Sequence, residues 1–97
     1  MKLPSIKAQP YLTKKHFKDL VYIYTHFGGN VQEEKLQEEL DELSNVLTPD
    51  EFCEELADVC ILALQFVLCD VKVQHHFIKK IDRTIERIKA GYYDNRM

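Results

Sequence analysis

A chain of 97 residues has room for one domain and for no separate regulatory module. Its formal net charge of −3 at pH 7 argues against a general nucleic-acid binder, which usually carries a basic excess. The longest apolar stretch, residues 59–69, is well short of the roughly 20 residues that a membrane-spanning helix needs. The N-terminal residues lack the apolar segment of a signal peptide. We therefore expect a cytoplasmic protein that binds neither membranes nor nucleic acid.

The first 28 residues predict an extended arm followed by a helix. Pro4 and Pro10 favour extended backbone over residues 1–11. From about Thr13, apolar residues recur at helical spacing, and Gly28 with Gly29 is expected to end that helix.

The three cysteines, Cys53, Cys60 and Cys69, occur without a CxxC pair and are expected to be buried thiols in a reducing compartment.

Two acidic and apolar segments follow. Asn30 with Glu33 suggests a capping box for a second helix that runs to about Leu47. Thr48 and Pro49, followed by acidic residues, are a strong start signal for a third helix that runs to about Cys69.

A turn over residues 70–73 should lead into a fourth helix with apolar residues at helical spacing, and Gly91 should cap it. Residues 92–97 form a tail. The predicted fold class is all-α: one domain over residues 1–97, a four-helix protomer whose helices pack in antiparallel fashion.

The third helix is apolar on almost every side. Between Val59 and Cys69, Gln65 is the one clearly polar residue. A helix of this kind must be covered on most of its surface, and four helices offer limited material for that. We therefore expect a second subunit to pack against it, in a homodimer or homotetramer. The alternative is the central helix of a compact monomer.

Two pairs of carboxylates mark the second and third helices. Glu39 and Glu42 are three residues apart, as are Glu55 and Asp58, so each pair projects from one helical face. The short connection between the helices makes them antiparallel neighbours and brings the pairs together. Converging carboxylates suit Mg²⁺, with Mn²⁺ as a substitute, because these ions prefer a few carboxylates plus waters and substrate phosphates. Such spacings also occur on solvated helices that bind no metal.

The same residues resemble a known family. Glu38, Glu39 and Glu42, then Glu55 and Asp58 after twelve residues, match the EExxE…ExxD signature of MazG-like all-α nucleotide pyrophosphohydrolases. Phe27-Gly28 before the acidic helix and the EELADV segment at residues 54–59, followed by an apolar run, are similar too, so the resemblance covers roughly residues 17–90.

The resemblance implies a helical fold that assembles as dimers or dimers of dimers. It implies Mg²⁺ bound by Glu39, Glu42, Glu55 and Asp58, with Glu39 or Glu38 orienting the attacking water. The implied reaction cleaves a nucleoside triphosphate between its α and β phosphates and gives a monophosphate and pyrophosphate.

The basic fourth helix could neutralise substrate phosphates. Its candidate substrate-binding residues are Lys79, Lys80, Arg83 and Arg87. The family often has a Lys followed by an Asn in this region, and this sequence has Arg83 near the Asn position. A solvated basic face is the alternative for these side chains. For the whole chain, the alternatives are a phosphoribosyl-ATP pyrophosphohydrolase and a non-catalytic helical interaction protein.

Overall fold

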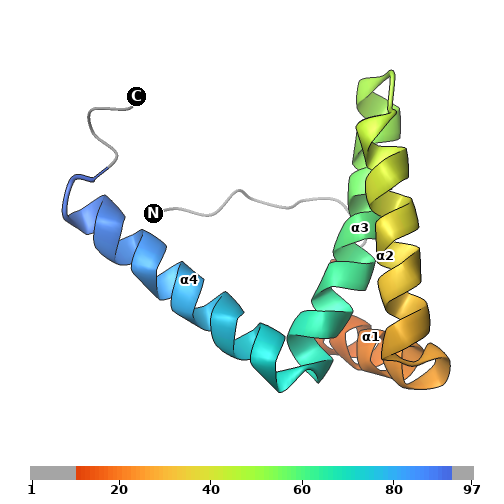
Figure 1. Ribbon diagram of the computed structural model, residues 1–97, viewed down its shortest axis with the longest axis horizontal. Coiled ribbons are helices and arrows are strands. Elements are labelled where there is room, and N and C mark those ends of the chain that lie inside the picture. Colours follow the sequence, from red (N-terminus) through yellow and green to blue (C-terminus); the bar gives the residue numbers. More distant parts are fainter. Residues whose placement is uncertain (1–10, 93–97) are drawn as a thin grey trace.

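The computed structural model describes residues 11–92, and these residues form four helices and no strand (Figure 1). The helices are α1 (Lys14–Phe27), α2 (Gly29–Ser44), α3 (Pro49–Cys69) and α4 (Val71–Lys89). The all-α prediction is confirmed. Residues 1–10 of the predicted arm and 93–97 of the predicted tail lie outside the described residues.

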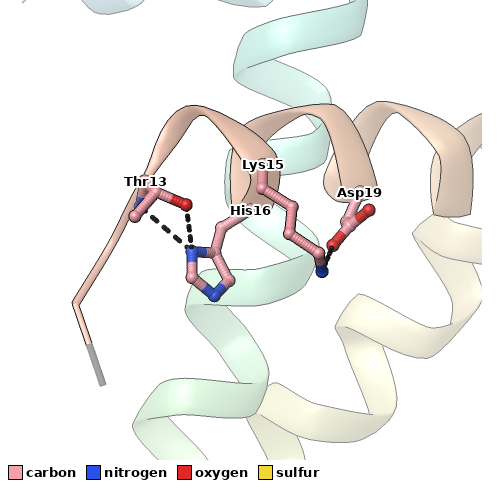
Figure 2. A network of polar contacts seen from close by, with 4 residues as sticks. All are labelled: Thr13, Lys15, His16 and Asp19. Atoms are coloured by element: carbon pink, nitrogen blue, oxygen red, sulfur yellow. Dashed lines mark hydrogen bonds and ion pairs between the residues drawn. The ribbon is translucent and has the colours of Figure 1, made fainter. Parts of the chain in front are cut away.

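Helix α1 begins directly after Thr13, which is its N-cap, close to where the helical spacing of the sequence starts. The backbone N–H of Thr13 donates to Nδ1 of His16 at 3.0 Å, and the Thr13 hydroxyl lies 3.0 Å from the same nitrogen (Figure 2). Because a backbone N–H can only donate, this Nδ1 is the acceptor and carries no proton. One turn on, Lys15 Nζ and Asp19 Oδ2 form an exposed ion pair at 2.9 Å (Figure 2).

The junction between α1 and α2 is a single residue. Gly28 has φ +88°, a conformation that L side chains rarely adopt, and it caps both helices. The predicted Asn30–Glu33 capping box is wrong, because the N-cap of α2 is Gly28, two residues before Asn30, and no side chain caps the helix. Gly29 is crowded for a different reason: a Cβ there would lie 2.7 Å from the hydroxyl of Tyr24, so the ring would have to shift.

Helices α2 and α3 form an antiparallel hairpin. Helix α2 ends at Ser44 rather than near Leu47, because the Ser44 hydroxyl and the Asn45 side-chain amide both donate to the carbonyl of Asp41. Helix α3 begins at Pro49 as predicted, and the Thr48 hydroxyl accepts from the backbone N–H of Glu51 at 3.1 Å. The short loop between them fixes the two helices side by side.

The break between α3 and α4 is also one residue long. The Asp70 carboxylate accepts from the backbone N–H groups of Lys72 and Val73, so it caps α4 directly. The predicted four-residue turn over 70–73 is therefore too long. At the other end, α4 stops at Lys89, and Gly91 follows the cap with φ +76°.

The helices are packed unevenly. Helices α2 and α3 make the most extensive contact, and α1 packs across both at the base of the hairpin (Figure 1). The ring of Tyr24 on α1 meets the ring of Phe66 on α3 edge to face, 5.4 Å between centroids. Helix α4 contacts α3 and neither α1 nor α2, and Figure 1 shows it leaving the base of the hairpin at an angle.

Few side chains are buried in this single chain. Among residues 11–92, Leu62 is the one fully buried hydrophobic residue, and all of α4 is exposed. Cys53 and Cys60 are exposed, so the prediction of buried thiols is wrong for both, and Cys60 lines an open groove between α1 and α3. Cys69 is half-buried, and burial raises the pKa of its thiol. No helix in the described range is long and apolar enough to cross a membrane.

Candidate metal centre

Three glutamates converge between α2 and α3, near the closed end of the hairpin. Glu39 and Glu42 come from α2, and Glu55 comes from the second turn of α3. One carboxylate oxygen from each residue lies within 4.8 Å of the others. The i,i+3 spacing places the first two on one face, and the antiparallel hairpin sets Glu55 opposite them.

The cluster is half-open. Glu39 and Glu55 are half-buried, and Glu42 is exposed. One oxygen of Glu39 and one of Glu55 are out of solvent, and no hydrogen-bond donor of the described residues reaches either. A buried carboxylate oxygen without a donor is unfavourable, so the pair calls for a proton or a cation.

The pKa values also show that the ionised carboxylates are unfavourable at this place. Desolvation, proton sharing and repulsion from the neighbouring carboxylates raise the pKa of Glu55 from 4.5 to about 7, with Glu42 the larger contributor and Glu39 the smaller. Desolvation and repulsion from Glu42 and Asp58 raise the pKa of Glu39, while a hydrogen bond with Glu55 opposes the rise. The cluster therefore binds a proton more tightly than an ordinary glutamate does, and a divalent cation would displace that proton.

The donor set fits a hard divalent cation. Three carboxylates with an open side are what Mg²⁺ and Mn²⁺ take up, because both keep several positions for water and phosphate oxygens. A thiol or imidazole contributes nothing here, since the residues that come together are all glutamates. The residues that would hold the ion are Glu39, Glu42 and Glu55.

Two predicted acidic residues lie beside this group rather than in it. Asp58 is exposed, one turn after Glu55, and it is close enough to Glu39 to raise the pKa of that carboxyl. It is not among the three residues whose oxygens converge. Glu38 is exposed on α2 and is also outside the group. The structure thus brings together three of the four predicted metal ligands.

The predicted phosphate-binding residues lie elsewhere in the chain. All four are exposed on α4, which does not contact α2: Lys79, Lys80, Arg83 and Arg87. The Arg87 guanidinium lies 5.0 Å from the centre of the Tyr92 ring, a cation–π contact. Within one chain, these side chains are not brought to the acidic cluster.

A buried polar contact between the same two helices was not predicted. The side-chain amide of Gln32 donates to the Oε1 of Gln65 at 2.9 Å, and Gln65 in turn donates to the carbonyl of Ile61 at 3.1 Å. Gln32 is 2% exposed and Gln65 0%. The isolated Gln65 inside an apolar run was the available signal, since a buried amide needs a partner on a neighbouring helix.

No family model, no curated protein and no solved structure matches this chain. The comparisons therefore assign the chain to no family, and its known features are the four-helix fold and the acidic cluster.

Proposed function

We propose that the chain is a Mg²⁺-dependent nucleoside triphosphate pyrophosphohydrolase of the MazG-like kind, which cleaves between the α and β phosphates. The convergence of Glu39, Glu42 and Glu55 within 4.8 Å carries the proposal. The order and spacing of these residues, with Glu38 and Asp58, resemble the family signature. The two carboxylate oxygens without donors add a physical reason for a cation at this place.

Each residue of the cluster has a proposed role. Mg²⁺ held there would supply positive charge for the phosphates and a water of lowered pKa. Glu39, Glu42 and Glu55 would hold the ion, and Asp58, next to Glu39, would ligate it directly or through water. Glu39 or Glu38 would orient the attacking water, and a carboxylate that faces the open side of the cluster is suited to accept its hydrogen bond.

The proposed assembly is a homodimer or homotetramer. In support, the largest hydrophobic residues of the described chain are mostly exposed, including Phe77 at 44%, Ile81 at 47% and Ile85 at 45% along α4. A domain of this length needs more buried apolar surface than one fully buried leucine provides. Because α4 does not reach α2 in its own chain, phosphate binding by Lys80 or Arg83 at the cluster requires the α4 of another copy.

The test is a panel of nucleoside triphosphates incubated with Mg²⁺ and scored for pyrophosphate against phosphate release. We expect pyrophosphate from at least one substrate and its loss in Glu42→Gln. The matched control is Glu54→Gln, which removes a neighbouring exposed carboxylate outside the cluster. Phosphate as the only product would contradict α–β cleavage.

The non-catalytic interaction protein is the competing function, and the exposed apolar surface favours it. Metal binding separates the two. If Mg²⁺ and Mn²⁺ leave the melting temperature unchanged, and no triphosphate is hydrolysed, the interaction protein is the better description.

A further inference from the structure

The Gln32–Gln65 pair contains the two least exposed residues of the described chain. It bridges α2 and α3 at the open end of the hairpin, away from the loop at residues 45–48. The glutamate cluster lies toward the closed end, about 10–15 Å further along the helix axes at 1.5 Å per residue. The loop therefore connects the two helices at one end of the hairpin, and the Gln32–Gln65 hydrogen bond connects them at the other. The cluster lies between these two connections.

Hydrophobic burial alone does not decide how α3 is rotated against α2. From Val59 to Cys69 the helix is apolar on nearly every side, so several faces could cover α2 equally well. Gln65 removes this ambiguity, because its amide needs a hydrogen-bonding partner once it is buried. Gln32 provides that partner, so one rotation of α3 satisfies both side chains.

The same rotation and register serve the acidic residues. Gln32 and Glu42 are ten residues apart on α2, and Glu55 and Gln65 are ten residues apart on α3. Pairing the two glutamines therefore sets Glu42 level with Glu55 across the antiparallel hairpin. A slip of one turn would move one helix by about 5.4 Å, more than the 4.8 Å that spans the cluster.

The pair is poorly suited to a role in stability alone. The Oε1 of Gln32 is buried and receives no hydrogen bond from any donor of the described residues. Two apolar side chains of similar size would avoid that cost. A buried polar pair that is retained in spite of such a cost is used in other helical proteins to fix register.

We propose that Gln32 and Gln65 are positioning residues, whose hydrogen bond sets the register and rotation of α3 against α2 so that Glu39, Glu42 and Glu55 converge. The effect of this pair on metal binding rests on the proposed function. Its effect on the register of the two helices does not.

The test compares the full-length protein with a Gln32→Leu/Gln65→Leu double variant and with Gln37→Leu as the control. Gln37 is an exposed glutamine on α2, so Gln37→Leu makes the same substitution on the same helix as Gln32→Leu but outside the hydrogen-bonded pair. Mn²⁺ affinity is measured by calorimetry. Register is measured without metal, as the distance between spin labels at the exposed positions Lys35 and Glu54, with the native cysteines replaced and labelled chains diluted in unlabelled ones.

For the double variant we expect unchanged helical content, a melting temperature equal to or above that of the parent, Mn²⁺ binding at least tenfold weaker, and more than one label distance. The control should match the parent in all four. A double variant that keeps one sharp distance and binds Mn²⁺ within threefold of the parent overturns the proposal. If the parent itself binds no Mn²⁺, the proposed function fails, and the label distances alone decide the register.

A milder variant tests the proposal in case the double variant does not fold. Gln32→Asn shortens the side chain by one methylene, so the amide no longer reaches Gln65, while its polarity is kept. We expect a broadened label distance in this variant. An unchanged sharp distance would overturn the proposal.

Discussion

Protonation of Glu55 would compete with the proposed metal binding at the acidic cluster. Burial and the neighbouring carboxyls of Glu42 and Glu39 raise its pKa to about 7, and a metal ion takes only the ionised form. With that pKa, about nine in ten molecules carry the proton at pH 6 and about one in ten at pH 8. Mn²⁺ binding should therefore strengthen about tenfold from pH 6 to pH 8.

The assay is isothermal titration calorimetry in two buffers of different ionisation enthalpy, which gives both the affinity and the protons released. We expect about 0.9 proton released per Mn²⁺ at pH 6 and about 0.1 at pH 8. Glu54→Gln, an exposed neighbour outside the cluster, should keep both values. Glu55→Gln should bind weakly at both pH values and release no proton. An affinity that is flat between pH 6 and pH 8, with no proton release, would refute the reasoning.

The same pKa makes a prediction for the metal-free protein. Because the folded chain holds the Glu55 proton more tightly than the unfolded chain, this carboxyl contributes its full stability below pH 4.5. That contribution is lost as the pH rises from 4.5 to about 7. The melting temperature without metal should therefore be higher at pH 5 than at pH 8. A smaller difference is expected in Glu55→Gln and with saturating Mn²⁺, and an equal difference in all three samples would contradict the origin in this residue.

Three further predictions test the scaffold. Thr48→Ala should lower the free energy of unfolding by about 1 kcal/mol in urea, and Thr48→Ser should restore it, because the hydroxyl caps α3. Gly29→Ala should lower the melting temperature, because the new Cβ lies 2.7 Å from the Tyr24 hydroxyl; adding Tyr24→Phe should recover part of the loss, and no recovery would contradict the clash. Ile81→Glu should reduce the mass found by sedimentation, whereas Asp82→Lys should not; equal masses would exclude this face of α4 from the assembly.

The starts of α1 and α3 were predictable, because capping and helical spacing are local, whereas the starts of α2 and α4 were placed too late in the chain. Thr48 is the N-cap that the sequence predicts, and α1 begins close to Thr13, where the helical pattern starts; each threonine has a hydrogen-bonding partner three residues on. Among the helix ends, that of α2 was misplaced. Helix α2 stops where Ser44 and Asn45 side chains compete for a backbone carbonyl, and that competition needs no glycine or proline.

The acidic cluster was predictable to the level of helical faces. Spacing predicted that Glu39, Glu42 and Glu55 share one side of the hairpin, and the structure agrees. Spacing does not determine the depth to which a side chain is buried. It therefore did not separate Asp58, which is exposed, from Glu55, which is half-buried. Depth depends on how far each helix is rotated, which is a tertiary property and the property that we assign to Gln32 and Gln65.

The placement of the basic residues shows most clearly what a helical pattern leaves open. Residues 71–89 have one apolar and one basic face, and that pattern is the same whichever way the helix points. The direction is set by Asp70, a single residue between α3 and α4, which ends one helix and caps the next without a loop long enough to fold α4 back onto α2. The chain therefore holds its acidic cluster within one hairpin but leaves its basic helix and most of its apolar surface facing outward. On the proposed function, one copy would complete the metal site, whereas phosphate binding by α4 at the cluster would require two copies. We therefore predict that dilution weakens turnover before it weakens Mn²⁺ binding.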